Sequence, residues 1–461
     1  MTSFQDFGLA EPISRALKEE NYHTPTPIQA QTIPLAMTGR DVVGIAQTGT
    51  GKTAAFALPI LHRILENRIR PQPKSCRVLV LSPTRELSGQ ILDSFNAYGR
   101  HIRLSSALAI GGVPMGRQVR SVMQGVEVMV ATPGRLLDLV QSNGLKLGQV
   151  EFLVLDEADR MLDMGFINDI RKIVGKLPIK RQTLFFSATM PKDIAELAEA
   201  MLRDPARVAV TPVASTVERI TQRILQVDFA AKPAILAQLL KQEPVDRALI
   251  FTRTKHGADR VVRFLEGAGI QAAAIHGNKS QAQRTTALQA FRHGHVKLLV
   301  ATDIAARGID VSGVSHVINF EIPNVAEQYV HRIGRTARAG AEGVAISFVA
   351  DDERPYLKAI ERATRQKIAI AALPENFNEA VRNLPKAAPP KKGQPQTAEQ
   401  QSRRADGQRR YQDQQKQGQQ PRGTGERAHR PEGDTPAKKP FRRRRGGVGA
   451  HKGAVQRTGQ R

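Results

Sequence analysis

The sequence predicts an α/β protein with two parallel-sheet domains in tandem, followed by a disordered basic tail. First, short β-rich apolar runs alternate with amphipathic stretches, the pattern of a parallel sheet with crossover helices. Second, this alternation breaks once, at 203–221, and then restarts, which predicts two separate sheets. Third, the chain beyond about Pro385 is rich in Gln, Arg, Gly, Pro and Lys, and such a segment buries too little apolar surface to fold.

Ten apolar runs are predicted to be strands. Their nearly continuous apolar character is typical of strands buried on both faces of a sheet. The runs are Asp41–Ile45, Arg77–Leu81, Val126–Ala131, Glu151–Leu155 and Thr183–Phe186 in the first half, then Ala248–Phe251, Ala272–Ile275, Val296–Val300, His316–Phe320 and Val344–Val349. Helices are predicted at Pro191–Leu202, whose apolar residues share one face, and from Asp351 to about Lys367.

These elements predict four segments. The first domain spans 1–207, a linker 208–222, the second domain 223–380 and the tail 381–461. The tail carries 21 Lys and Arg against 6 Asp and Glu, a net +15 out of the +25 of the whole chain. Such a charge favours a polyanion partner, because each neutralised phosphate releases counterions, although a merely solubilising tail would have the same composition.

Composition excludes several classes of protein. A single cysteine, Cys76, excludes a disulfide framework within one chain and a cysteine zinc cluster, and is typical of a reducing cytoplasm. We interpret Cys76 as a packing residue at a strand edge. No apolar run approaches the length of a membrane span, and the N-terminus lacks the apolar core of a secretory signal. A cytoplasmic protein is therefore expected.

A phosphate-binding loop is predicted between the first strand and the next helix. Two glycines let backbone N–H groups approach phosphate oxygens, and the following helix N-terminus adds partial positive charge. Lys52 is suited to the β- and γ-phosphates of a nucleotide, and the Thr53 hydroxyl to Mg²⁺. The loop consists of Ala46, Gln47, Thr48, Gly49, Thr50, Gly51, Lys52 and Thr53.

Two acidic residues follow the strand predicted at Glu151–Leu155. A carboxylate at the end of an apolar strand costs free energy unless it has a cation partner, so Asp156 is predicted to hold Mg²⁺. Glu157, directly after it, is predicted to orient or deprotonate the attacking water. An acidic helix N-terminus is the alternative, but the phosphate loop about a hundred residues earlier favours catalysis.

From about Phe4 to about Lys367 the chain resembles the DEAD-box RNA helicases of superfamily 2, with tandem RecA-like domains. Asp156-Glu157-Ala158-Asp159 is the family's namesake motif, and Ala46 at the start of the loop is usual in the family. Thr24-Pro25-Thr26-Pro27-Ile28-Gln29 resembles the Q motif, which implies that Gln29 reads the adenine edge and that Phe4 is the upstream aromatic. The short N-terminal flank and basic tail resemble the bacterial RhlE-like type.

The resemblance assigns further residues to ATP chemistry. Ser187-Ala188-Thr189 resembles the motif that couples hydrolysis to RNA remodelling through the Asp156–Asp159 loop, and Thr189 could also cap the next helix. Arg332 and Arg335, in the motif 331–338, are placed three apart on an expected helix and are predicted arginine fingers. The family has glycine where this chain has Ala337. Asp310 is predicted to contact the ribose.

The RNA contacts implied by the resemblance are hydroxyls, glycine amides and arginines at strand ends, so binding should be independent of base sequence. Contacts to 2′-hydroxyls would favour RNA over DNA. The residues are Pro83, Thr84, Arg85, Gly112, Thr132 and Arg135 in the first domain and Arg253 and Thr302 in the second, with Gly111, Gly134, Thr252, Gln281, Arg284 and Asp303 beside them.

The sequence thus predicts an ATP-dependent RNA helicase with Mg²⁺ as cofactor. It would unwind or remodel RNA duplexes and ribonucleoproteins by RNA-stimulated ATP hydrolysis, in ribosome assembly or RNA decay. The main alternative is an RNA-binding or annealing protein in which the tail dominates and the ATPase only regulates. A DNA translocase is disfavoured by Asp159 and Gln29, and a structural subunit of the RNA degradation machinery stays open.

Overall fold

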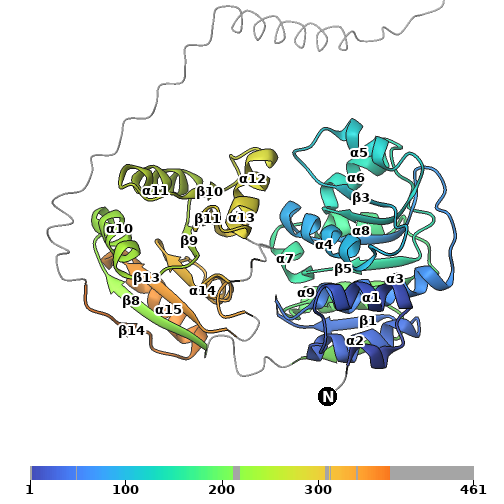
Figure 1. Ribbon diagram of the computed structural model, residues 1–461, viewed down its shortest axis with the longest axis horizontal. Coiled ribbons are helices and arrows are strands. Elements are labelled where there is room, and N and C mark those ends of the chain that lie inside the picture. The colour runs from blue at the N-terminus through green and yellow to red at the C-terminus, as the bar shows by residue number, and fades with distance from the viewer. Residues whose placement is uncertain are drawn as a thin grey trace, which may run out of the picture. The chain divides into compact units, whose positions relative to one another are not determined.

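The protein folds into two lobes, each built on a parallel β-sheet (Figure 1). The computed structural model describes residues 3–47, 49–210, 219–306, 311, 313–338 and 341–373. We call 3–210 the first lobe and 219–373 the second lobe. The predicted tail, 381–461, lies outside the described residues, and no described helix is long and apolar enough to span a membrane.

Over the described residues, the first lobe has a seven-stranded sheet in the order β3-β4-β2-β5-β6-β1-β7, with every neighbouring pair parallel. Its strands are β1 (Val42–Ile45), β2 (Cys76–Leu81), β3 (Ser106–Ala109), β4 (Val126–Ala131), β5 (Phe152–Leu155), β6 (Gln182–Ser187) and β7 (Ala206–Ala209). Its helices are η1 (Phe4–Phe7), α1 (Glu11–Glu19), α2 (Pro27–Met37), α3 (Lys52–Glu66), α4 (Arg85–Tyr98), α5 (Met115–Ser121), α6 (Pro133–Gln141), α7 (Ala158–Asp163), α8 (Ile167–Val174) and α9 (Lys192–Met201).

Helices cover both faces of this sheet, because successive strand residues point to opposite sides. Val78 and Val80 of β2 lie in one apolar core together with residues of α1 to α4. Leu79 and Leu81 lie in the other, together with residues of α6 to α9. The strands are therefore buried on both sides, which explains why their sequences are continuously apolar.

The second lobe repeats the plan with a seven-stranded parallel sheet of described residues, in the order β10-β11-β9-β12-β13-β8-β14. Its strands are β8 (Ile220–Gln226), β9 (Ala248–Thr252), β10 (Ala273–Ile275), β11 (Leu298–Thr302), β12 (His316–Asn319), β13 (Gly343–Val349) and β14 (Ala369–Ile370). Its helices are η3 (Phe229–Ala231), α10 (Lys232–Gln242), α11 (Lys255–Gly267), α12 (Gln281–Arg292), α13 (Asp303–Ala306), α14 (Ala326–Ile333), η4 (Asp351–Glu353) and α15 (Arg354–Thr364).

The predicted α/β architecture is confirmed, with corrections at the domain junction. All ten predicted strands are present with ends shifted by a few residues, but β3, β7, β8 and β14 were not predicted. Strands occupy both ends of the segment expected to link the domains, since 208–209 belong to β7 and 220–222 to β8, and the domain bounds stay a prediction. Residues of β7 alternate between buried and exposed, and this edge-strand pattern is less conspicuous than a continuous apolar run.

The predictions for two helices and for Cys76 can also be compared with the structure. The helix predicted at Pro191–Leu202 is α9, with Pro191 just before its first residue. The long helix expected from Asp351 divides into η4 and α15. Cys76 opens β2 and is fully buried, and burial raises the pKa of its thiol to about 12, so the packing interpretation is confirmed.

The sheet order brings three chemically important strand ends together. In the first lobe β6 lies between β5 and β1, and all three strands are parallel. The phosphate loop follows β1, the acidic motif follows β5, and the Ser187 motif ends β6. Ligand sites of open α/β sheets lie beyond the carboxyl ends of the strands, so this edge is where a site is expected.

We expect Gly44→Ala to destabilise the protein, because β1 has no room for a side chain there. A Cβ atom at Gly44 would lie 2.6 Å from Cδ1 and Cε1 of Phe186 on the neighbouring strand. Overpacking of this kind costs about 1–3 kcal/mol, measurable as a lower midpoint of urea unfolding. The control is Gly89→Ala in α4, which meets open space and should be neutral or stabilising by up to about 1 kcal/mol. Equal midpoints for the two variants would contradict the packing argument.

Candidate functional site

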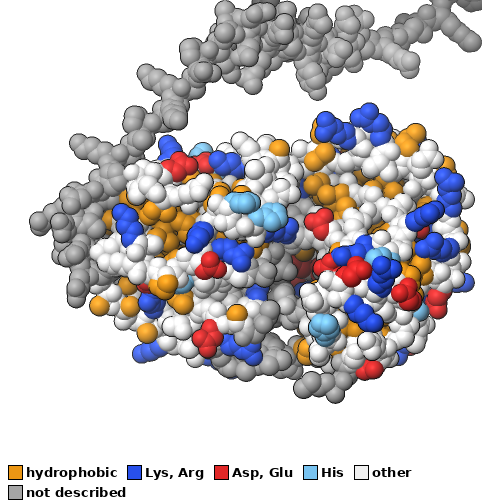
Figure 2. Space-filling view, viewed as in Figure 1, with side chains coloured by type: hydrophobic (Ala, Val, Ile, Leu, Met, Phe, Trp, Pro, Cys, Tyr) orange, Lys and Arg blue, Asp and Glu red, His pale blue; other side chains and the backbone are white. Residues whose placement is uncertain are grey.

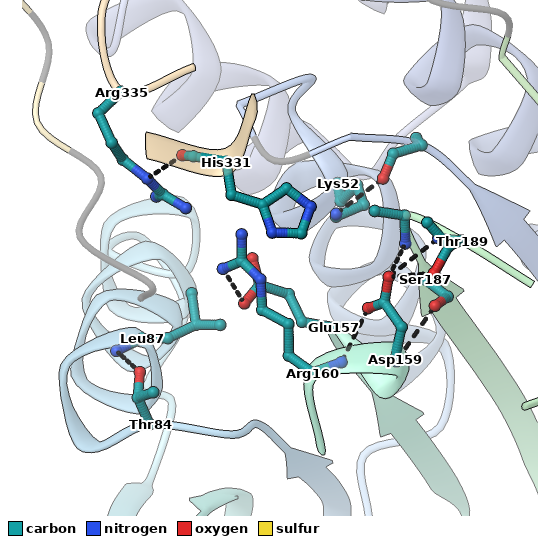
Figure 3. A network of polar contacts seen from close by, with 12 residues as sticks. Lys52, Thr84, Leu87, Glu157, Asp159, Arg160, Ser187, Thr189, His331 and Arg335 are labelled. Carbon is teal, nitrogen blue, oxygen red and sulfur yellow. Dashed lines mark hydrogen bonds and ion pairs between the residues drawn. The ribbon is translucent and has the colours of Figure 1, made fainter. Parts of the chain in front are cut away.

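The phosphate loop is held in shape by two glycines with left-handed backbones. Gly49 has φ +86° and Gly51 has φ +89°, values that favour glycine. Lys52, at the start of α3, is buried, and its Nζ donates to the carbonyl of Ala46, 2.9 Å away (Figure 3). The lysine thus lies inside its own loop, and phosphate binding by Lys52 stays a prediction. Thr48 lies outside the described residues.

Gln29 braces this loop. Its Oε1 accepts from the N–H of Thr26 at 2.9 Å, and its Nε2 donates to the carbonyl of Gly51 at 3.0 Å. Thr26 adds a second link, because its hydroxyl donates to the carbonyl of Thr50 at 2.8 Å. The Q motif therefore fixes the backbone of the phosphate loop, a structural role that the sequence analysis missed. Adenine reading by Gln29 stays a prediction.

Phe4 is buried, and its ring contacts the rings of Phe7 and Tyr22, with centroids 5.8 and 5.9 Å away. It belongs to the apolar core that also contains residues of α2 and α3. The upstream aromatic thus packs η1 against the body of the lobe. A contact between Phe4 and a nucleotide stays a prediction.

Asp156 is a fully buried carboxylate at the carboxyl end of β5. Its Oδ1 accepts no hydrogen bond from any described residue. Burial raises the pKa of Asp156 to about 6; the positive charge of Lys52 opposes this shift and the negative charge of Glu157 adds to it. A desolvated carboxylate oxygen without a donor is suited to a cation, and Mg²⁺ binding by Asp156 stays a prediction.

Glu157 has a strained backbone and a buried ion pair. Its φ of +56° lies in the left-handed region, and it directly precedes α7. Its Oε2 accepts from Nη1 of Arg160 at 2.7 Å, and both side chains are almost completely buried (Figure 3). Arg160 was missed by sequence analysis, although Glu157 and Arg160 have the three-residue spacing that brings side chains together on a helix.

Asp159 connects the acidic motif to the end of β6. Its Oδ2 accepts three hydrogen bonds, from the N–H of Ala188 (3.2 Å) and from the N–H and hydroxyl of Thr189 (both 2.9 Å). Ser187 completes the link, because its Oγ accepts from the N–H of Asp159 at 3.2 Å (Figure 3). The expected hydrogen-bond relay is present, whereas α9 has no side-chain cap among the described residues. The coupling role itself stays a prediction.

Arg332 does not lie where an arginine finger is expected. Its Nε and Nη2 donate to Asp303 at 2.5 and 2.7 Å, and its Nη1 donates to Asn319 and to the carbonyl of Glu321. The guanidinium also lies 5.0 Å from the ring centroid of Phe251, and the residue is 1% exposed. The contacts make Arg332 an internal brace that links β9, β12, α13 and α14, so reaching a γ-phosphate would break four hydrogen bonds.

Arg335 and Arg338 lie beyond the helix that was expected to carry them. Because α14 ends at Ile333, Arg332 is on the helix, whereas Arg335 and Arg338 lie after its end. Arg335 lines a small pocket with His331, Arg332 and Asp303. A Cβ atom at Gly49 would lie 3.7 Å from Cδ and Nε of Arg338, a contact that the sequence analysis did not identify.

The position of Ala337 explains the family's preference for glycine there. Ala337 has φ +54°, a conformation that costs an L-residue roughly 1–2 kcal/mol. The departure therefore affects the backbone between Arg335 and Arg338. Asp310, the expected ribose contact, lies outside the described residues.

Two predicted RNA-binding arginines of the first lobe converge on one loop. A Cβ atom at Gly112, where φ is +78°, would lie 2.3 Å from Nη1 of Arg85. Arg135 donates from Nη1 to the carbonyl of Val113 at 2.8 Å. The Thr84 hydroxyl caps α4, because it accepts from the N–H of Leu87. Thr132 directly precedes α6 but makes no side-chain hydrogen bond to its first turn, and Pro83 adjoins Thr84.

In the second lobe Thr252 ends β9, Thr302 ends β11, and Arg253 directly follows β9. Gln281 and Arg284 open α12, where Arg284 donates to Glu86 at 2.7 Å and Gln281 accepts from Arg85 at 3.3 Å. Figure 2 shows Lys and Arg side chains scattered over the visible face among acidic and apolar ones.

Comparisons with known proteins decide the family. Residues 26–197 match the model of the DEAD/DEAH box helicases, and 231–340 match that of the helicase conserved C-terminal domain. The DEAD-box ATP-dependent RNA helicase CshA of Bacillus subtilis (strain 168) is 43% identical over 366 residues, 79% of this chain and 73% of that protein. CshA of Geobacillus kaustophilus is 44% identical over 368 residues, 80% of this chain and 78% of that protein. This chain belongs to the DEAD-box helicase family.

Solved structures of DEAD-box proteins agree with the fold. S. cerevisiae Dbp5 bound to RNA and ADP BeF3 matches with a TM-score of 0.72 and 30% identity, over 83% of this chain and 98% of that one. Mss116p bound to ssRNA and AMP-PNP matches with a TM-score of 0.71 and 28% identity, over 82% and 81%. The two lobes are therefore tandem RecA-like domains. The protein is an ATP-hydrolysing, ATP-dependent RNA helicase, while the RhlE-like subtype stays a prediction.

We expect Asp156→Asn to stabilise the ligand-free helicase at pH 8. The folded pKa of about 6 lies above the ordinary value of 3.8, so the folded state binds the proton more tightly than the unfolded state. Stability is therefore lost as the pH rises from about 4 through 6, and the ionised carboxylate remains a penalty above that range. Removing the charge should contribute on the order of 2 kcal/mol at pH 8 and less at pH 4.5.

Thermal unfolding at the two pH values measures this effect. The matched control is Asp163→Asn, which changes an exposed carboxylate at the end of α7 and should give no pH-dependent difference. A lower melting temperature for Asp156→Asn than for the wild type at pH 8 would contradict the desolvation argument.

Proposed function

We propose that the protein unwinds or remodels RNA locally, using RNA-stimulated hydrolysis of ATP at the carboxyl edge of the first-lobe sheet. The observation that carries this proposal is the buried Asp156 carboxylate, whose Oδ1 has no donor among the described residues, on the same edge as Lys52. Such a carboxylate is costly unless a cation completes it, so the site is suited to a nucleotide accompanied by a metal ion.

The residues present fit Mg²⁺, the cofactor that we propose. Mg²⁺ prefers oxygen ligands and usually keeps several waters, binding through one or two carboxylates and substrate phosphates. Asp156 and the Thr53 hydroxyl would hold it, and it would neutralise charge on the transferred phosphoryl group. Among the described residues no cluster of three or more His, Cys, Asp or Glu could form an all-protein metal site, which agrees with this sparse set of ligands.

Lys52 is proposed to bind the β- and γ-phosphates after its Nζ leaves the Ala46 carbonyl. Glu157 is proposed to take a proton from the attacking water, or to orient that water. Its ion pair with Arg160 holds the carboxylate away from bulk solvent in a defined position. The remaining residues of the loop, 46–51, would bind phosphate through backbone N–H groups.

Arg335 is proposed as an arginine finger that stabilises negative charge on the γ-phosphate in the transition state. Arg338, whose side chain lies near Gly49 of the phosphate loop, is the better second candidate than Arg332. Arg332 is instead proposed to position the motif from inside the second lobe, since its guanidinium binds Asp303, Asn319 and Glu321.

RNA is proposed to bind along strand and helix ends of both lobes through backbone contacts, without base reading. Gln29, Phe4 and Asp310 are proposed nucleotide contacts. Binding of ATP and RNA would favour one conformation, and loss of the γ-phosphate would release it. We propose ribosome assembly or RNA decay in the cytoplasm as the setting. The alternative, in which the basic tail dominates and the ATPase only regulates, does not account for the buried acidic motif and the phosphate loop at one edge of the first-lobe sheet.

Glu157→Gln tests the proposed chemistry. We expect the variant to bind ATP and RNA normally and to hydrolyse ATP about 10²- to 10⁴-fold more slowly, the usual contribution of a general base. Turnover at saturating ATP and RNA, with fluorescence anisotropy for RNA affinity, measures both properties. The control, Glu199→Gln, changes an exposed residue of α9. Normal turnover by Glu157→Gln would remove this residue from the proposed mechanism.

Removing the Ser187 and Thr189 hydroxyls tests whether they couple ATP hydrolysis to duplex unwinding. We expect the double variant Ser187→Ala/Thr189→Ala to hydrolyse ATP at a similar rate, because the Ala188 and Thr189 backbone N–H groups still bind Asp159. Duplex unwinding should fall by about tenfold or more, since each lost hydrogen bond is worth roughly 1 kcal/mol. The ratio of strands separated to ATP consumed is the measurement. An unchanged ratio would exclude a coupling role for these hydroxyls.

A further inference from the structure

A buried ion pair in the second lobe belongs to none of the sites described so far. Lys232, the first residue of α10, and Glu353, the last residue of η4, are 0% and 1% exposed. Lys232 Nζ lies 2.5 Å from Glu353 Oε2 and donates to the carbonyl of Phe348 at 3.0 Å. The N–H of Ala350 donates to the same Oε2 at 3.1 Å. The pair fastens α10 to the end of β13.

Stability alone is a poor reason for this pair. Desolvation of two buried charges commonly offsets their attraction, and well-packed apolar residues are often as stabilising or more so. Burial lowers the pKa of Lys232, and the hydrogen bond to Glu353 opposes that shift. The neighbouring residues of α10 and β13 belong to an apolar core that an uncharged pair would extend. The charges therefore require another explanation.

The contacts of the second Glu353 oxygen, Oε1, suggest why the charges are there. Oε1 accepts no hydrogen bond from any described residue, yet it lies 3.0 Å from Nη2 of Arg253 as an ion pair. Arg253 is also held by its Nη1, which donates to Asn324 Oδ1 at 3.1 Å, and by its backbone N–H, which donates to Glu321 at 2.6 Å. The Arg253 side chain is 27% exposed, so Glu353 joins an interior lysine to a surface arginine.

This arrangement suits a phosphate ligand. A guanidinium has five N–H donors in a rigid plane, and a phosphate uses two of them side by side when the plane is correctly oriented. Contacts to Glu353 and Asn324 fix the plane while leaving the other N–H groups of Arg253 for a ligand. Fixing a flexible side chain before binding reduces the entropy lost on binding.

We propose that Lys232 and Glu353 are positioning residues for RNA binding, which hold the Arg253 guanidinium so that its remaining N–H groups bind an RNA phosphate. The inference rests on the proposed function, because it requires Arg253 to contact RNA. Lys232 holds the Glu353 carboxylate through Oε2, and Glu353 holds the Arg253 guanidinium through Oε1.

The test replaces the buried pair with apolar residues of similar length, Lys232→Met/Glu353→Leu, in the full-length protein. Affinity for a fluorescein-labelled single-stranded oligouridine is measured over a range of salt concentrations with AMP-PNP and Mg²⁺. Arg253→Ala alone and the triple variant are measured in parallel. The control is Arg77→Met/Glu151→Leu, which removes an ion pair with a buried arginine from the first lobe and contacts no predicted RNA residue.

We expect Arg253→Ala to weaken RNA binding by about tenfold and to lower the salt slope by about one, as for the loss of one phosphate contact. The double variant should show the same two changes, and the triple variant should be no worse than either. The RNA concentration for half-maximal ATPase should rise, while the rate at saturating RNA stays within about twofold. A folded double variant with wild-type affinity and salt slope would overturn the proposal, as would equal losses in the control.

Asn324→Ala provides a second measurement if the double variant does not fold, because Asn324 is exposed and only its bond to Arg253 is removed. An intermediate loss of RNA affinity, absent when Arg253 is already alanine, supports positioning. Unchanged affinity overturns it. The proposed function fails separately, if RNA does not stimulate the wild-type ATPase. When RNA stimulates the wild type but Arg253→Ala binds RNA normally, only the positioning proposal fails.

Discussion

The free-energy cost of burying carboxylates at the end of β5 is the constraint on which the rest of the site depends. Three acidic side chains of one four-residue motif are buried, and two of them, Asp159 and Glu157, bind different partners. Asp159 accepts N–H and hydroxyl donors from the end of β6, and Glu157 pairs with Arg160. Asp156 alone keeps an oxygen with no donor among the described residues, with its pKa raised by burial. Because burial without a partner is costly, the residue that lacks one is where a ligand contributes most.

The same contacts tie the acidic motif to the end of β6. Asp159 lies on α7, which follows Asp156 and Glu157, and its Oδ2 binds the backbone of Ala188 and Thr189. A displacement of the acidic motif must therefore move the end of β6 or break these bonds. The Q motif makes a similar link to the phosphate loop, because Gln29 Nε2 donates to the Gly51 carbonyl. The phosphate loop and the acidic motif are thus each tied to a neighbouring segment by hydrogen bonds.

The sequence was sufficient for the fold and for the residues with strong local signals. Strands buried on both faces are continuously apolar, so β2 and β4 were predictable, whereas the alternating edge strand β7 was assigned in part to a linker. Residue type and motif order located Lys52 and Asp156. They did not reveal that α14 ends at Ile333, and the assumption of one helical face gave Arg332 a finger role that its contacts disfavour. Whether a charged side chain is buried depends on tertiary packing, so it cannot be predicted from the local sequence pattern.

Arg332 and Glu353 are both buried charges of the second lobe, and they differ from the buried carboxylates of the first lobe in what they contact. Each is an almost fully buried charge in the second lobe, and each contacts a residue near the end of a central strand: Asp303 after β11 and Arg253 after β9. In the first lobe the buried carboxylate of Asp156 lies at the carboxyl edge of the sheet itself. In the second lobe the buried charges, Arg332 and Glu353, lie in the interior. Each contacts a charged residue that follows a strand, Asp303 or Arg253. Substitutions of such interior charges should therefore change ligand affinity more than stability, since the apolar core around them tolerates uncharged replacements of similar volume.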